Sequence, residues 1–310
     1  MMRVIVGRLL QLPLVLAIIY LITFALVWVV PGDPFSNERT VDPFVAQQLK
    51  ERYHADTPWN FLTHYPVSVL RHGDFGLSMQ YKEWSVNDII GASLPVSITL
   101  GVVAMLFATA AGIAIGVLAA VRRDGVIDWL SLSISLIGIS LPAFVLAALL
   151  LIASASDPLR GIFAVGRFER PVDVLLPGLA LSLAPMAYIA RLTRVSMLDV
   201  LSSDFVRTAR AKGLSRSNVV WKHCLRNAVL PVLSYLGPAA AVTLTGSFVV
   251  EKVFNIPGLG QHFVNSVLNR DRTLILGVVM VYSTFVLLLN LLVDVLYGVI
   301  DPRVRIGGQR

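Results

Sequence analysis

The feature that most constrains this chain is a set of six long runs without a single charged side chain. A helix that crosses a bilayer needs about 20 predominantly apolar residues, with a range of about 17–25. Only 15% of the residues are charged, whereas a soluble domain has about 25%. We therefore expect an all-α membrane protein with six transmembrane helices. The runs cover residues 9–30, 95–121, 130–156, 174–190, 228–250 and 274–293. The first run is too long for the apolar part of a signal peptide, so we expect an uncleaved span.

The distribution of basic residues predicts the orientation of these spans. Lys and Arg concentrate in cytoplasmic segments. With the N-terminus inside, the inner segments hold 15 Lys and Arg in 63 residues, and the outer segments hold 11 in 105. An N-in, C-in topology is therefore favoured. It divides the chain into the N-terminus and first span (1–31), an outward cap (32–94) and a five-span core (95–310) with a cytoplasmic loop (191–227).

The outward cap contains local signals for two helices. Asp42 followed by Pro43 suits the start of a helix that runs to about His54, and residues 59–71 suit a second helix. Residues 72–76, His-Gly-Asp-Phe-Gly, are typical of a turn. The cap histidines lack the spacing of a metal site, so we expect none. Because about 60 residues bury only a modest core, the cap should rest on the membrane part.

Small, polar and proline residues mark the interiors of the spans. Gly112 and Gly116 are four residues apart, which lets another helix approach closely. Several prolines in or near spans favour kinks, which are either rigid structural bends or hinges of a pathway. Polar residues of span five are candidates for a translocation path, with helix packing as the alternative role. They are Ser234, Tyr235, Thr243, Thr245 and Ser247.

The sequence lacks the usual motifs of nucleotide binding and hydrolytic chemistry. It contains no GxxxxGK[ST], HExxH or GxSxG pattern. Charged residues inside the spans would indicate a proton relay, but the runs contain none; Asp294, directly after the last run, most simply forms a structural pair. We expect no catalytic residue, no metal and no cofactor, so energised transport would need a partner that binds ATP. A self-contained secondary transporter or channel is the alternative, and a membrane enzyme is disfavoured.

The cytoplasmic loop is too basic to be another span. Residues 205–231 hold six basic side chains and no acidic one. Each Lys or Arg at the centre of a bilayer costs about 2.5–3.5 kcal/mol. The neighbouring apolar residues cannot offset six such costs, so the segment must remain outside the membrane.

Local signals in this loop predict two short helices. One of residues 202–204 can begin a helix that ends at Ala211, and Gly213 suits the left-handed residue that stops it. Ser215 can begin a second helix over residues 216–226.

The second of these helices has an apolar face. Val220 stacks on Cys224, and Trp221 stacks on Leu225, at i, i+4 spacing. We expect this face to be exposed, which suits docking into the groove of another protein. A helix lying on the bilayer surface is the alternative. A DNA-reading helix-turn-helix is disfavoured, because spans begin and end close by on both sides.

Residues 205–214, Phe-Val-Arg-Thr-Ala-Arg-Ala-Lys-Gly-Leu, resemble the coupling loop of ABC importer permeases of the peptide/nickel class. Segments 32–40, 81–88 and 230–235 are most similar to the membrane B subunits of oligopeptide permeases. Matches elsewhere extend the resemblance over the whole chain. They are residues 31–34 (Pro-Gly-Asp-Pro), Gly246-Ser247 with Glu251, residues 257–260 (Pro-Gly-Leu-Gly), Arg270-Asp271, residues 290–297 and Asp301-Pro302-Arg303.

The chain departs from the broader importer pattern at two places. That pattern has Glu-Ala-Ala where this chain has Arg207-Thr208-Ala209. It also has an early proline, which here comes only at Pro231. The peptide class shares both changes, so they point to this subfamily among the importer permeases.

The resemblance implies a type I importer permease fold with a coupling helix that sits in a cleft of an ATPase subunit. It implies a second permease, two ATP-binding subunits that bind ATP and Mg²⁺, and an extracytoplasmic substrate-binding protein, all at the inner membrane. The substrate would be a peptide, most simply an oligopeptide; dipeptides, glutathione and nickel chelates are alternatives, and no nucleic acid is implied. The coupling residues would be Arg207, Ala209, Lys212, Gly213, Leu214, Val220, Trp221, Cys224 and Leu225.

Overall fold

The computed structural model describes residues 2–30, 51, 57–81, 84–156, 162–163 and 166–300, without the side chains of 2–5, 245–246, 294 and 296–300. Apart from an isolated bridge between Leu77 and Ser85, the regular structure of the described residues is helical. The elements are α1 (Met2–Val29), α3 (Pro58–His72), α4 (Val86–Val121), α5 (Val126–Ser140), α6 (Ala143–Ala155), η1 (Pro171–Val174), α7 (Leu175–Leu201), α8 (Asp204–Ala211), α9 (Arg216–Asn218), the π-helical η2 (Val219–Cys224), α10 (Leu225–Ala228), α11 (Leu230–Phe254), α12 (Leu259–Leu268) and α13 (Arg272–Ile300).

The apolar helices agree with the predicted all-α membrane fold. Four candidate spans of the described chain are single helical stretches, and the total rises to six if each of two bent helix pairs is one span. The single stretches are Val6–Val29, Val86–Val121, Pro171–Leu201 and Arg272–Val293.

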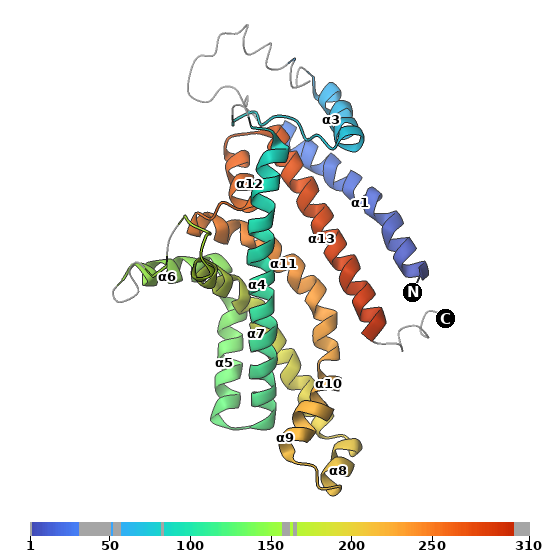
Figure 1. Cartoon of the computed structure of the whole chain (residues 1–310), viewed down its shortest axis with the longest axis vertical. Coiled ribbons are helices and arrows are strands. Elements are labelled where there is room, and N and C mark those ends of the chain that lie inside the picture. The colour runs from blue at the N-terminus through green and yellow to red at the C-terminus, as the bar shows by residue number, and fades with distance from the viewer. Residues whose placement is uncertain are drawn as a thin grey trace.

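The third predicted span is bent beside Pro142, and a second bend lies at the start of the fifth, which agrees with the kinks that prolines in or near the spans favour. α5 and α6 meet at an angle of 104°. Between them Leu141 has an extended backbone (φ −85°, ψ 120°), because a residue that precedes proline, here Pro142, disfavours the helical conformation. A second bend of 53° separates Arg216–Ala228 from Leu230–Leu244. The third apolar run therefore changes direction near its middle, as Figure 1 shows for α5 and α6.

Close packing of α4 against α7 confirms the predicted role of the small residues. A Cβ atom added at Gly112 would lie 2.8 Å from the carbonyl oxygen of Met186, and one at Gly116 would lie 2.5 Å from that of Ala190. Both distances are too short for a side chain, so only glycine permits this backbone approach.

Replacing Gly116 by alanine is expected to destabilise the protein by about 1–3 kcal/mol, the usual cost of overpacking. Gly91→Ala on the same helix is the matched control, because a Cβ atom there meets nothing within 4 Å. Thermal unfolding of both purified variants in detergent measures the difference. Equal midpoints would show that the α4–α7 contact tolerates a methyl group.

The cap and the basic loop (residues 202–229) lie at opposite ends of the molecule (Figure 1). α3 lies at the top of the view, above the upper ends of α1 and α13, and α8 and α9 form the bottom. The N-terminus marks the lower end of α1, and the chain leaves α13 at its lower end. The lower ends of α1 and α13 therefore both face the side of the basic loop, as an N-in, C-in topology requires.

Aromatic side chains attach the cap to the membrane helices. Tyr65 of α3 stacks on Tyr20 of α1 with ring centroids 6.2 Å apart, and Phe61 lies 5.5 Å from Trp28. The Tyr20 hydroxyl donates to the carbonyl of Leu62 at 3.0 Å. This confirms that the described part of the cap rests on the membrane part; the predicted helix from Asp42 to His54 lies outside the described residues.

Both ends of α3 are capped by residues next to the helix. Thr57 Oγ1 accepts from the backbone N–H of Asn60 at 3.2 Å, and Gly73 ends the helix in the left-handed conformation (φ 66°). The Tyr65 hydroxyl donates to the carbonyl of Thr273 at 3.0 Å. Burial raises the pKa of Tyr65 well above its usual value, which keeps this hydroxyl protonated as a donor. α3 is therefore fixed to α13 as well as to α1.

Candidate functional site

The basic loop, residues 202–229, begins with α8 and its glycine stop. The N–H of Leu214 donates to the carbonyl of Ala209 at 3.3 Å, and that of Gly213 donates to Arg210 at 2.9 Å. Gly213 has φ +78°, which completes a Schellman motif. The predicted helix and its stop are confirmed. The N-cap residue is Ser203, but its hydroxyl donates to the carbonyl of Val200 and makes no cap bond.

α8 presents one buried and one exposed side. Val206 is buried against the membrane helices, whereas Phe205 and Arg207 are exposed. The helix is followed by the exposed residues Lys212, Gly213 and Leu214, and Ala209 is partly buried. The exposed docking surface of the loop is therefore α8 and the turn after it.

The second helix of the loop differs from the expectation. It begins at Ser215, whose Oγ accepts from the N–H of Asn218, but it widens into the π-helix η2 before α10. Val220 and Cys224 are buried at 4% and 0% exposure, in a cluster with Val117, Ala120, Met197, Val206, Val219 and Ala228. The prediction of an exposed Val220/Cys224 face is wrong, because this face covers the ends of α4 and α7. Trp221 is half exposed, and Leu225 is partly buried against the cluster.

A buried ion pair lies beside the loop. The guanidinium of Arg194 on α7 contacts the carboxylate of Asp128 on α5 through two N–O pairs, at 2.5 and 2.7 Å. Asp128 is only 3% exposed, and it also accepts from the N–H of Asp124. Such a bidentate contact fixes both distance and orientation. Residues 191–201, predicted as part of the loop, are instead the last turns of α7.

The loop is also bonded to α4. Arg216 donates to the carbonyl of Val121 at 2.9 Å. Together with the buried cluster, this bond joins the loop to the ends of α4 and α7, and the Asp128–Arg194 pair joins α7 in turn to α5. The loop and the adjacent ends of these three helices are therefore connected by direct contacts.

The polar candidates of span five do not share one environment. Thr243 and Ser247 are buried, and each hydroxyl donates to a carbonyl of its own helix, at 2.7 and 2.6 Å. Both therefore have the packing role given above as the alternative. Tyr235 stacks on Tyr188 with centroids 4.2 Å apart. The side chain of Thr245 lies outside the described residues.

Ser234 differs from these residues because it lines a cavity of about 330 Å³ between α1, α11 and α13. Arg8 and Gln11 of α1 and Asn290 of α13 also line this cavity. Ser234 is exposed, and its hydroxyl donates to the carbonyl of Leu230 at 3.3 Å. It is therefore the pathway candidate whose surroundings remain open.

Glu251 is one of the residues that match the importer permeases, but the sequence does not show what it does. This residue of α11 is fully buried, and its Oε2 accepts from the N–H of Gly260 at 2.8 Å. Ser97 of α4 accepts from the N–H of Leu259 at 2.8 Å. Together these two side chains fix the start of α12 to α4 and α11. An acidic residue directly after a long apolar run was the available signal.

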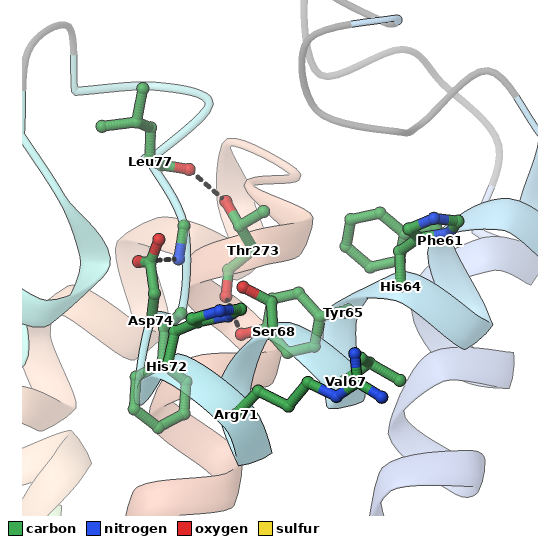
Figure 2. Close-up of a pocket in the computed structure, with 12 residues that line it drawn as sticks. Phe61, His64, Tyr65, Val67, Ser68, Arg71, His72, Asp74, Leu77 and Thr273 are labelled. Carbon is green, nitrogen blue, oxygen red and sulfur yellow. Dashed lines mark hydrogen bonds between the residues drawn. The ribbon is translucent and has the colours of Figure 1, made fainter.

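The cap encloses a cavity of about 410 Å³ at the outer end of the molecule. Figure 2 shows Tyr65 and Thr273 at its centre, with Arg71, His72 and Asp74 around them. The Thr273 hydroxyl donates to the carbonyl of Leu77 at 2.8 Å, and Asp74 accepts from the N–H of Gly76. The outward-facing cavity is thus lined by a cation (Arg71), a carboxylate (Asp74) and aromatic rings such as that of Tyr65.

The fold and loop define a membrane component of a transporter, and comparison with known proteins gives the family. Residues 112–306 match the family described as "Binding-protein-dependent transport system inner membrane component", and the chain belongs to it. It is 41% identical to the dipeptide transport system permease protein DppB of Bacillus subtilis, over 99% of each chain. It is 42% identical to the oligopeptide transport system permease protein OppB of Salmonella typhimurium, over 98% of this chain and 100% of OppB.

A solved structure supports the fold alone. The inward-facing MetNI methionine ABC transporter matches with a TM-score of 0.54 and 17% identity, over 69% of this chain and 96% of that one. The chain is therefore an inner-membrane, multi-pass permease component with the predicted type I fold.

Proposed function

We propose that this chain is the permease subunit of an ATP-driven importer of peptides, chiefly oligopeptides, and that α8 is its coupling helix. The observation that carries the proposal is the exposed, glycine-stopped α8, mounted on the ends of α4, α5 and α7. The relatives, named as dipeptide and oligopeptide permeases, support peptides as the substrate class. Dipeptides are the closest alternative; glutathione and nickel chelates follow.

The family supports the following set of partners. A second permease completes the pathway, and two ATP-binding subunits hold ATP and Mg²⁺ and contact α8. An extracytoplasmic binding protein delivers the peptide to the cap. When ATP closes the ATPase dimer, α8 moves with it, and the attached α4, α5 and α7 tilt as a unit. This motion gives alternating access, with Gly213 setting the direction of the docked helix.

The test is reconstitution of the purified permease pair in liposomes, with and without the ATPase subunits. We expect uptake of a labelled pentapeptide only when the ATPases, ATP and the binding protein are all present. A labelled dipeptide in parallel separates the two substrate classes. Uptake driven by an ion gradient without any ATPase would favour the secondary transporter instead.

A further inference from the structure

A cleft of about 260 Å³ lies between the ends of α4 and α7 and the basic loop. Three arginines from three different segments line it: Arg123 from the turn after α4, Arg210 from α8 and Arg216 from α9. Leu198 and Val220 contribute apolar lining. The cleft is thus an arginine-lined opening with an apolar part.

The charge of this cleft is not balanced by its own walls. None of the residues that the structure places along it is acidic. Arg123 contacts Asp124 at 3.4 Å, but both side chains are well exposed, so this pair contributes little. Arg216 uses one guanidinium nitrogen for the carbonyl of Val121 and retains further N–H donors. Three arginines along one cleft favour an anion with several acceptor oxygens.

The position of the cleft points to the source of that anion. α4, a candidate span, ends at Val121, directly beside the cleft. Trp129 and Trp221, on neighbouring segments, are 70% and 50% exposed, and tryptophan is enriched at the membrane–water interface. Basic clefts between helices on the cytoplasmic side bind anionic lipid headgroups. The apolar part of the cleft suits the glycerol and first acyl carbons.

We propose that this cleft binds the phosphate group of an anionic phospholipid of the inner leaflet, held by Arg123, Arg210 and Arg216. The phosphate joins the end of α4 to α8 and α9, in addition to the bond from Arg216 to Val121. Bound lipid therefore stiffens the contact between the basic loop and the spans.

Native mass spectrometry of the purified full-length chain tests the proposal, with short-chain phosphatidylglycerol, short-chain phosphatidylcholine and inorganic phosphate as separate probes. We expect phosphatidylglycerol to bind about tenfold more tightly than phosphatidylcholine. Arg210→Gln should weaken phosphatidylglycerol binding by about fivefold or more. Arg226→Gln removes the same charge from the same loop outside the cleft, and it should change binding by less than about twofold.

Several outcomes would overturn the proposal. Equal binding of the two lipids would exclude an anionic headgroup site, and equal effects of Arg210→Gln and Arg226→Gln would show general attraction only. Displacement of lipid by inorganic phosphate at low millimolar concentration would assign the site to a soluble anion. Loss of the lipid when the ATPase subunits bind would assign the arginines to a protein partner. Arg123→Gln is the second variant, since its exposed side chain leaves the fold intact.

Discussion

Gly213→Pro is expected to reduce ATP-driven peptide uptake by at least about tenfold, while the chain still inserts into the membrane. Gly213 has φ +78°, whereas proline is restricted to about −65°. The change also removes the N–H that donates to Arg210. Strain of about 1–3 kcal/mol or more then redirects the chain after α8. Initial uptake rates in proteoliposomes, together with the ATPase activity of the assembled complex, measure the loss.

Gly213→Asn is the matched control for this experiment. Asparagine adopts the left-handed conformation more readily than other residues with side chains. A Cβ atom at this position meets nothing within 4 Å, so the added side chain causes no steric clash. We expect most of the uptake to be retained. Normal uptake by Gly213→Pro at equal protein levels would disprove the assignment of α8 as the coupling helix.

Arg194→Gln is expected to destabilise the protein by about 1–3 kcal/mol, the usual cost of leaving a buried group without its partner. Asp128 is 3% exposed, so its carboxylate cannot regain full hydration. The thermal midpoint of the purified chain in detergent measures the effect. Because the pair joins α5 to α7, the surviving protein should also show weaker coupling between ATP hydrolysis and uptake.

Two further variants distinguish the effect of breaking the ion pair from the effect of removing a positive charge. Arg191→Gln removes an exposed arginine from the same helix and should leave the midpoint nearly unchanged. The double variant Asp128→Asn with Arg194→Gln should recover much of the lost stability, because no unpaired charge remains. If Arg191→Gln and Arg194→Gln had equal effects, the buried pair would have no special role.

Local features of the fold could be predicted from the sequence. The α8 helix and the Gly213 stop depend on neighbouring residues, and both were predicted correctly. The close approach at Gly112 and Gly116 follows from the small side chains themselves. The number of apolar runs gave the correct fold class, and the prolines indicated kinks, but the sequence could not give the 104° angle between α5 and α6.

Features that depend on tertiary contacts could not be predicted. The Val220/Cys224 face is apolar in sequence, but periodicity does not show whether a partner or the chain's own helices cover it. The Asp128–Arg194 pair joins residues 66 positions apart, and no local pattern in the sequence connects them. The contact of Glu251 could not be predicted either. Its partner, the N–H of Gly260 at the start of α12, comes close to it only in the folded chain.

The attachment of the cap has a mechanical consequence for communication between the two faces of the membrane. The cap is fixed to α1 and α13, whereas the basic loop is fixed to α4, α5 and α7. α11 packs against α4 and α7 on one side and against α13 on the other. A tilt of α11 would therefore displace helices of both groups at once, so this helix links the position of the cap to that of the basic loop.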